Sequence, residues 1–534
     1  MKKILFFCIF FCSFFLLKAQ QRVEIERTQD AIVLDGILNE KAWKNSTPIT
    51  YIQHSPNYGD KPSEHTEVKL SYDDDFIYMW AIMKDSEKPQ TFALTRDGGS
   101  WSDDWIVIIL DSYNDKENGL IFSTTPSGLR WDASIRDGGV DNIEMNQSWN
   151  SFWDVATHVT DEGWSAEFKI PLSSLRFQNI DGKIVMGLIS WRKISRLNEV
   201  NIYPDIAPIF GGMSFFKVSQ SQDVEFEDIE SKNPVYVKPY VLTGFGSNYE
   251  HNQDKSELNS VDMNQFEVGV DVKYNLTSNL VMDATINTDF AQVEADNQEV
   301  NLSRFSLFFP EKRSFFMERS SSFDMGFGYN NKVFYSRRIG LDDGKRVRIL
   351  GGLRLVGRIG KWDVGILNMQ TDNSDDLVGE NLGVVRLRRQ IFNPNSYLGL
   401  ITTTRLGSDG SHNVVYGADG IVRVVGDEYV KFAFAQSTET EMSKGIFASE
   451  TSRYYLNWER RIQKGFSYVI EGSFVGNDYN PSLGFESRKN YKSINLNPRY
   501  SWFPENSATV FQYNTGVGYW EIYNAISGEI GRAH

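Results

Sequence analysis

The sequence predicts an all-β protein, with an N-terminal β-sandwich followed by an antiparallel transmembrane β-barrel that we expect to be truncated in this chain. Three observations predict this fold class. Apolar and polar residues alternate with period two in many short segments, as in strands with one buried face. Of the 534 residues, 14% are aromatic and 42 are glycine, while the mean hydropathy is only −0.38. The alternating segments also become longer beyond residue 233.

Residues 22–220 are expected to form the β-sandwich. Val68, Leu70 and Tyr72 alternate with polar neighbours, and the segment 164–170 alternates in the same way. The segment 105–110 is apolar throughout, which suits a central strand covered on both faces. Short strands of both kinds, separated by polar turns, are typical of a sandwich.

An acidic segment that is poor in apolar residues separates the two parts. Residues 219–232 contain five acidic side chains. Charged segments of this kind are typical of linkers. We therefore expect a linker at 221–232 and a barrel domain at 233–528.

The second part carries one apolar face and one polar face along its strands. The pattern recurs in the segments 353–359, 453–459, 494–502 and 511–519. Segments of about ten residues match a tilted crossing of the hydrocarbon layer, and aromatic residues gather near their ends. Short turns such as 360–361 and 426–427 alternate with longer polar loops such as 372–380. A soluble sheet is the alternative, and these features favour the barrel.

The first nineteen residues are predicted to be a cleaved secretion signal. Lys2 and Lys3 precede the apolar stretch 4–17, and the segment 1–19 ends on a small residue, Ala19, after which we place the cut. An uncleaved anchor helix is the alternative, but the stretch is short for a span of about 20 residues. The protein is therefore expected to be exported.

Both cysteines of the chain, Cys8 and Cys12, lie within the predicted signal. Neither disulfides nor thiolate metal sites are then available to the mature chain. Removal of the signal, which holds three lysines and no acidic residue, takes the formal net charge from −15 to −18. Such an acidic chain is not expected to bind nucleic acid, whose phosphates require a basic surface.

Three stretches of the N-terminal part carry a family resemblance. They are Ile32-Val33-Leu34-Asp35-Gly36-Ile37-Leu38-Asn39-Glu40 with Ala42-Trp43, Ser102-Asp103-Asp104 with Leu110-Asp111, and Trp164-Ser165-Ala166-Glu167-Phe168-Lys169-Ile170-Pro171. Together they resemble carbohydrate-binding module family 9, a β-sandwich that grips the ends of glycan chains. The resemblance covers about residues 22–220, and it implies a polysaccharide or oligosaccharide as partner.

Four stretches of the second part carry a more specific resemblance. They are 289–296, 301–305, 308–318 and 335–340. They resemble a barrel family of unknown function, domain of unknown function 5916, which in bacteria of the Bacteroidetes type commonly follows a family 9 module. Arg319 stands where that family usually has glycine, so the local turn is expected to differ. The resemblance implies an outer-membrane location, with membrane lipid as a second partner.

Binding of a sugar requires flat aromatic rings for its apolar face and carboxylates or amides for its hydroxyls. Trp101 is our first candidate because it lies between Gly98-Gly99 and Ser102-Asp103-Asp104, which suggests a loop. The full candidate set is Trp101, Asp103, Asp104, Arg130, Trp131 and Trp149. Most tryptophans of a sandwich lie in its core, so a purely structural role is the alternative for each.

Two aspartate runs, 73–75 and 103–104, could supply oxygen ligands to calcium. Aspartates that form turns are the alternative explanation. No other cofactor is expected.

A group of charged residues is expected inside the barrel, as a constriction or plug, or as a long loop folded against the wall. The group comprises Glu294, Asp296, Glu311, Lys312, Arg313, Glu318, Arg337 and Arg338.

Catalysis is not favoured, although a glycoside hydrolase remains the main alternative. Glycosidases need two carboxylates at a set separation, which the sequence does not give. The six histidines have no zinc spacing, and no nucleophile elbow or phosphate loop is found.

The preferred interpretation is an outer-membrane protein that binds glycan through its sandwich and serves carbohydrate uptake, attachment or catabolism. A structural envelope protein without sugar binding is a further alternative, and no protein partner is indicated. The last residues, 529–534, match one reading frame of a common sequencing adapter. We therefore expect the natural protein to continue past about residue 527.

Overall fold

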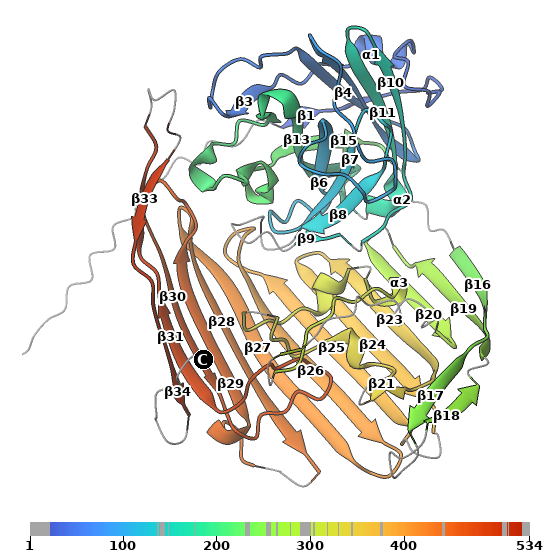
Figure 1. Ribbon diagram of the computed structural model, residues 1–534, viewed down its shortest axis with the longest axis vertical. Coiled ribbons are helices and arrows are strands. Elements are labelled where there is room, and N and C mark those ends of the chain that lie inside the picture. The colour runs from blue at the N-terminus through green and yellow to red at the C-terminus, as the bar shows by residue number, and fades with distance from the viewer. Residues whose placement is uncertain are drawn as a thin grey trace, which may run out of the picture.

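The protein is almost entirely β in its computed structural model, with one part stacked on the other (Figure 1). The structure describes residues 22–135, 138, 145–147, 149–175, 177–229, 235–251, 258–262, 265–277, 279–288, 301–302, 305–317, 319–328, 330–342, 345–373, 378–440, 444–504, 510 and 512–525. The predicted signal and the predicted adapter tail lie outside these residues, so both stay predictions.

The N-terminal part consists of two packed sheets, as predicted. The larger sheet has the order β1 (Val23–Glu24), β15 (Gln222–Glu227), β13 (Lys183–Ile194), β6 (Trp105–Asp111), β7 (Gly119–Thr124), β8 (Trp131–Ile135) and β9 (Met145–Asn146), with β3 (Ile52–Ser55), β12 (Asn179–Ile180) and β14 (Glu199–Tyr203) beside it. The smaller sheet has the order β10 (Asp154–Thr160), β11 (Gly163–Pro171), β5 (Phe76–Lys84), β4 (Thr66–Tyr72) and β2 (Glu26–Arg27). Apart from the parallel pairs β1 with β15 and β2 with β4, the strands pair antiparallel.

Strand β6 is covered on both faces, as its continuous apolar sequence predicts. Ile106, Ile108 and Leu110 pack into the core between the two sheets. Val107 and Ile109 belong to a second cluster on the outer face of the larger sheet, which the segment 205–218 covers. Both faces of the strand are therefore shielded from water, so neither face has to be polar.

The prediction of a linker at 221–232 is wrong for its first half. Residues 222–227 form β15, which pairs with β13 inside the sandwich. Val224 and Phe226 are buried in the core, and the acidic residues that alternate with them, Asp223, Glu225 and Glu227, pair with basic side chains. Glu225, for example, forms ion pairs with Arg22 and Lys183 at 3.0 and 2.5 Å. The charge that suggested a linker is thus neutralised by residues distant in sequence.

The second part is one large antiparallel sheet. Its main path runs through β16 (Val235–Gly244), β19 (Gln265–Asn275), β20 (Leu280–Ile286), β23 (Ile349–Ile359), β24 (Trp362–Thr371), β25 (Glu380–Gln390), β26 (Tyr397–Gly407), β27 (His412–Val425), β28 (Glu428–Glu439), β29 (Ser452–Arg460), β30 (Gly465–Val475), β31 (Tyr491–Leu496) and β34 (Tyr519–Asn524). Strands β32 (Arg499–Trp502) and β33 (Tyr513–Gly516) extend it from β30. Within the described residues the sheet is open, with β16 and β34 at the ends of its path.

The predicted alternation defines the two faces of this sheet. Leu456 on the convex side is 55% exposed, whereas its neighbour Asn457 on the concave side is only 4% exposed. The concave side is filled by the described residues between 305 and 348, which carry α3 (Ser314–Met317) and the short hairpin of β21 (Leu341–Asp342) and β22 (Lys345–Arg346) (Figure 1). The convex face has no such cover among the described residues, so its large apolar side chains remain exposed.

The remaining helices are short. They are α1 (Ala42–Asn45), α2 (Leu172–Leu175) and the 3-10 turns η2 (Ser195–Leu197), η3 (Pro208–Phe210), η4 (Ser214–Phe216), η5 (Val218–Gln220), η6 (Ser320–Phe323), η7 (Ser336–Arg338) and η8 (Ser449–Thr451). In the part of the chain that the structure describes, no helix has the length and apolar character needed to cross a membrane.

Candidate functional site

Trp101 lies in a tight turn just before β6, on the outer face of the larger sheet. Its indole is 45% exposed and rests on buried side chains. The ring of Phe215 is nearly parallel to it at a centroid distance of 5.8 Å, and Trp191 lies 6.1 Å away. Both supporting rings are buried, whereas nearly half of the Trp101 surface is open to solvent. We call Trp101 and its supports Trp191, Lys193 and Phe215 the Trp101 ledge.

Within the ledge, Lys193 is a buried lysine that lies against the Trp101 ring. Its Nζ lies 4.2 Å from the centroid of the Trp101 ring and donates a hydrogen bond to the Trp101 carbonyl oxygen. Burial lowers the pKa of Lys193 to about 8, against the opposing fields of Asp104 and Asp103. The lysine therefore fixes both the ring and the backbone of the turn.

Asp103 and Asp104 shape the loop and do not face solvent. Both are buried. Asp103 accepts hydrogen bonds from the backbone N–H groups of Ser100, at 2.8 Å, and Phe92. Asp104 accepts from the backbone N–H groups of Gln90 and Ser195 at 2.9 and 2.6 Å, and burial raises its pKa. Their oxygens are engaged in holding the ledge, so we remove both from the set of direct ligand contacts.

Gly99, which precedes the Trp101 turn, occupies a position that only glycine fits. Its φ is +113°, and a Cβ there would lie 2.5 Å from the Trp105 ring. Any other residue would be strained and would displace that ring. The Gly-Gly signal that marked Trp101 as a loop residue therefore has a steric cause.

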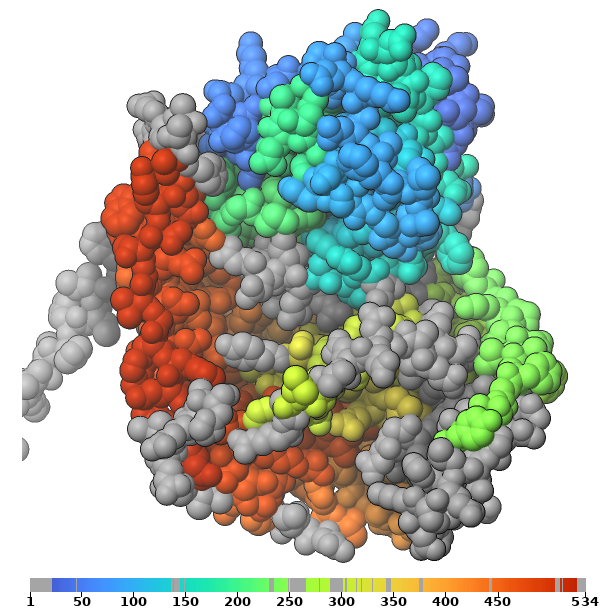
Figure 2. Space-filling view, in the orientation of Figure 1, coloured from blue at the N-terminus to red at the C-terminus, as the bar shows by residue number. Residues whose placement is uncertain are grey.

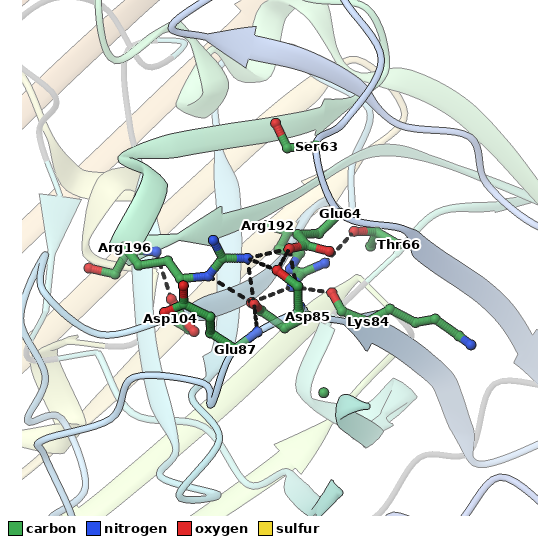
Figure 3. Close-up of polar contacts among 12 residues, drawn as sticks. Ser63, Glu64, Thr66, Lys84, Asp85, Glu87, Asp104, Arg192 and Arg196 are labelled. Atoms are coloured by element: carbon green, nitrogen blue, oxygen red, sulfur yellow. Dashed lines mark hydrogen bonds and ion pairs between the residues drawn. The ribbon is translucent and has the colours of Figure 1, made fainter. Parts of the chain in front are cut away.

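A buried ion cluster anchors the strand that carries Lys193. Figure 3 shows the guanidinium groups of Arg192 and Arg196 converging on Asp85, and Arg196 also pairs with Glu64. Arg192 Nη2 lies 3.3 Å from Asp85 Oδ2, and Arg192 also donates to Thr66 Oγ1 at 3.0 Å. Burial lowers the pKa of Arg192 to about 10, although Asp85 opposes this shift. The cluster ties the end of β13 to β4 and β5 of the other sheet.

The other candidates lie elsewhere in the sandwich. Trp149 is only 8% exposed and packs edge-on against Phe122 in the core, so it offers no surface to a ligand. Trp131 is half-buried against Trp105. Arg130 forms an ion pair with Asp154 at 3.0 Å. The structure therefore does not gather the six predicted residues into one site, and Trp101 is the tryptophan among them with an exposed ring.

The motif residues that suggested a family are structural. Glu167 accepts hydrogen bonds from the backbone N–H of Gly36 at 2.9 Å and from the Trp43 indole at 3.2 Å. Gly36 has a φ of +80°, and a Cβ there would lie 2.7 Å from the Thr157 backbone. The Asp-Gly opening is thus pinned to β11 by one buried carboxylate, away from the ledge.

The aspartate runs behave as turns. Asp73 accepts hydrogen bonds from the backbone N–H groups of Asp75 and Phe76, both at 2.8 Å, and from the Tyr78 hydroxyl at 2.9 Å. Asp74 pairs with Arg27. Among the described residues, no group of three or more His, Cys, Asp or Glu side chains could hold a metal ion.

The charged residues expected inside the barrel lie in its concave side where they are described. Glu311 binds Arg313 through two contacts of 2.9 and 2.7 Å and accepts from Ser336 at 2.6 Å. Arg337 and Arg338 donate to the carbonyl oxygens of Pro310 and Gly484, at 3.1 and 3.3 Å. The backbone N–H of Lys312 donates a hydrogen bond to Glu311 Oε1 at 3.0 Å. Glu294, Asp296 and Glu318 lie outside the described residues.

Comparison with known families separates the two parts of the chain. Residues 34–190 match the carbohydrate family 9 binding domain-like family, and residues 237–351 match the domain of unknown function DUF5916. The two matching segments follow one another in this order. The suspected layout is therefore confirmed. Arg319, within the segment that matches DUF5916, has a φ of +52°, the left-handed conformation that glycine favours.

No curated protein matches the chain. Solved structures that match include a family 9 carbohydrate-binding module from Caldicellulosiruptor kristjanssonii in complex with glucose. It is 15% identical, with 40% of this chain and 98% of that chain covered, at a TM-score of 0.28. Acinetobacter baumannii OccAB3 is 7% identical, with coverages of 78% and 92% and a TM-score of 0.26. The anion-selective porin from Comamonas acidovorans is 8% identical, with coverages of 86% and 100% and a TM-score of 0.20. Similarities this low decide nothing about the present chain.

Proposed function

We propose that the protein binds glycan chains on the Trp101 ledge and is anchored in the outer membrane by its large sheet. The half-exposed, rigidly supported indole of Trp101 is the observation that carries the first claim. The match of residues 34–190 to the carbohydrate family 9 binding domain-like family supports the same ligand class.

The chemistry of the ledge suits a pyranose ring. The apolar C–H face of a sugar packs on a flat aromatic surface, and the hydroxyls at its edge seek hydrogen bonds. Trp101 offers the flat surface, and the exposed Ser102 of the same turn offers a hydroxyl. The ring is held in place by Lys193 and Phe215, so little side-chain freedom is lost on binding.

The convex face of the large sheet supports membrane anchoring. Exposed apolar side chains recur along successive strands; they include Leu353, Ile366, Leu400, Leu456 and Ile470. Trp362 and Trp458, also exposed, lie near the strand ends closest to the sandwich, as expected of an interfacial aromatic belt. A sheet face of this size and character would aggregate in water, and hydrocarbon tails are the solvent that fits it.

Packing inside the sheet favours attachment over uptake. Phe316, Phe323 and Phe334 fill the concave side against Val356 and Leu367, within one continuous apolar cluster. A wide water-filled path would instead leave polar side chains wetted by solvent along this wall.

A binding experiment on the full chain in detergent tests the glycan claim. Wild-type protein should be retained by at least one polysaccharide or oligosaccharide on an array. Trp101→Ala should weaken that binding about 10-fold or more, as loss of one stacking aromatic implies. Phe152→Ala is the matched control, because Phe152 is 87% exposed and belongs to no part of the ledge. Equal binding by both variants would contradict the assignment of the ledge.

Fractionation tests the anchoring claim separately. The protein should sediment with outer membranes and should migrate differently on gels with and without heating. Recovery in the soluble fraction of lysed cells would contradict it.

A further inference from the structure

We infer that the sandwich sits on the periplasmic side of the outer membrane, so that its ligand is a glycan found in the periplasm. This inference rests on the proposed membrane anchoring. It depends on which rim of the large sheet the sandwich touches and on how the strands are connected at that rim.

The sandwich is docked on one rim of the sheet, at three turns between consecutive strands. Gln178 donates to the carbonyl oxygen of Gly360, between β23 and β24, at 3.0 Å. The carbonyl oxygen of Ile209 accepts from the backbone N–H of Gln463, between β29 and β30, at 2.6 Å. Lys217 and Asp427, the latter between β27 and β28, form an ion pair at 3.2 Å. Figure 2 shows the sandwich packed above the sheet domain at this end.

The docking is built into the packing of both parts. The side chains of Lys217 and Asp427 are only 1% and 6% exposed. At a second point, the Tyr113 ring of the sandwich lies between Arg319 and Arg358 of the sheet domain, at 4.5 and 4.9 Å, and Arg358 pairs with Asp115 at 3.2 Å. A buried ion pair is stable only when both partners meet in good geometry. The sandwich therefore has a defined seat on this rim.

The two rims differ in the length of their connections. On the rim that holds the sandwich, the connections between paired strands are 276–279, 360–361, 391–396, 426–427, 461–464 and, between β32 and β33, 503–512. All but the last of these are short. On the opposite rim they are 245–264, 287–348, 372–379, 408–411, 440–451 and 476–490. In Figure 1 the hairpin of β17 (Ser247–His251) and β18 (Leu258–Asp262) marks that opposite rim, far from the sandwich.

Outer-membrane barrels have short turns on the periplasmic side and longer loops on the outside. The short-turn rim of this sheet is the one that the sandwich occupies. The sandwich and its Trp101 ledge then face the periplasm, and the opposite rim faces the medium.

This orientation limits the ligand. Polysaccharides that remain outside the cell cannot reach the ledge. Two sources of pyranose chains can: the glycan strands of the cell wall, and oligosaccharides that have already crossed the outer membrane.

Single cysteines test the orientation directly, because the chain has no cysteine after residue 12. Lys88→Cys marks an exposed site on the sandwich and Ser408→Cys an exposed site on the opposite rim. In intact cells of a Gram-negative host, a membrane-impermeant maleimide should label Ser408→Cys and leave Lys88→Cys unlabelled. After permeabilisation of the outer membrane both should be labelled. Labelling of Lys88→Cys in intact cells would overturn the inference.

A result in which neither site reacts until permeabilisation would overturn both the orientation and the anchoring, because the whole protein would then lie in the periplasm. Fractionation keeps the two claims apart, since a protein that sediments with the outer membrane but shows the reversed labelling is anchored with the opposite orientation.

An engineered disulfide tests whether the sandwich is docked on this rim of the sheet. Backbone contact between Ile209 and Gln463 brings their Cα atoms within the range that a disulfide can bridge. The pair Ile209→Cys with Gln463→Cys should therefore oxidise in the full chain, and Lys88→Cys with Gln463→Cys should not. Failure of the first pair to form, in folded protein, would overturn the docking.

Two binding experiments distinguish between the two sources of the ligand. Purified cell-wall sacculi and soluble oligosaccharides are offered to wild-type protein and to Trp101→Ala. Retention of the wild type alone by either ligand supports the periplasmic assignment. Retention only by surface polysaccharides of the host would contradict it and leave glycan binding intact.

Discussion

Lys193 lies directly against Trp101, with Nζ 4.2 Å from the centroid of the indole ring and hydrogen-bonded to the carbonyl oxygen of the same residue. A charged group is thus buried beneath the most exposed tryptophan of the predicted site. The contact fixes the ring through cation–π attraction and the turn through a hydrogen bond. It also makes the ledge sensitive to pH.

We expect the stability of the sandwich to rise between about pH 8 and pH 10.4. The pKa of Lys193 is lowered to about 8 by burial, whereas an unfolded lysine titrates near 10.4. Within this window the unfolded state binds more protons than the folded state, so the free energy of unfolding increases with pH, by about 1–2 kcal/mol. Thermal unfolding followed by tryptophan fluorescence measures this.

Lys193→Met provides the control for that slope, because methionine keeps the apolar stem without the charge. The variant should lose the rise, while Lys88→Met, at an exposed position, should keep it. A slope that survives Lys193→Met would assign the titration to another group.

The two tryptophans Trp101 and Trp149 should respond in opposite ways to truncation. Trp149→Ala removes a buried core ring and should lower the free energy of unfolding by about 3–5 kcal/mol. Trp101→Ala should cost much less stability but most of the glycan affinity, because its ring is half-exposed. Denaturant titrations and binding isotherms on both variants separate the roles. Large stability loss in Trp101→Ala would mean that the ledge is part of the core.

Removal of Asp85 should be strongly destabilising. Its carboxylate is 1% exposed and pairs with Arg192 and Arg196, so Asp85→Ala leaves buried cations without a partner and should cost about 3–5 kcal/mol. The matched control is Glu162→Ala. Glu162 is 80% exposed in its pair with Lys84, and an exposed pair contributes at most about 1 kcal/mol. Similar losses in the two variants, measured by urea unfolding, would argue against the cluster as an anchor of β13.

Much of the fold follows from local patterns in the sequence. Period-two alternation predicted the strands of the large sheet and the identity of each face, as Leu456 and Asn457 illustrate. The continuous apolar run of β6 predicted a strand covered on both sides. The acidic segment at β15 was misread because its partners, Arg22 and Lys183, lie far away in the sequence. Only strand pairing brings these charges together.

The site was less predictable. Trp101 was found because a Gly-Gly pair and a run of small polar residues mark a loop, and Gly99 has a steric reason to be there. Trp149 and the aspartates 103 and 104 looked equally suitable, since local sequence does not tell which side chains turn inward. Lys193 was missed because it sits in an apolar strand, and its contact with Trp101 depends on how β13 pairs with β6.

The ion pair between Lys217 and Asp427 should couple the two parts of the molecule. Lys217→Met or Asp427→Asn alone leaves one buried charge without its partner and should lower the unfolding temperature of the sandwich clearly. The double variant removes both charges, so its loss should be smaller than the sum of the two single losses, with a coupling of about 1–3 kcal/mol. Burial lowers the pKa of Lys217, which makes the uncompensated lysine of Asp427→Asn easier to neutralise, so that variant should recover part of its stability at alkaline pH. Calorimetry of the four proteins in one detergent completes the cycle. Strictly additive losses would show that the two side chains do not interact. Among the described contacts, the docking of the sandwich would then rest on Tyr113, Asp115, Gln178 and the backbone contact of Ile209.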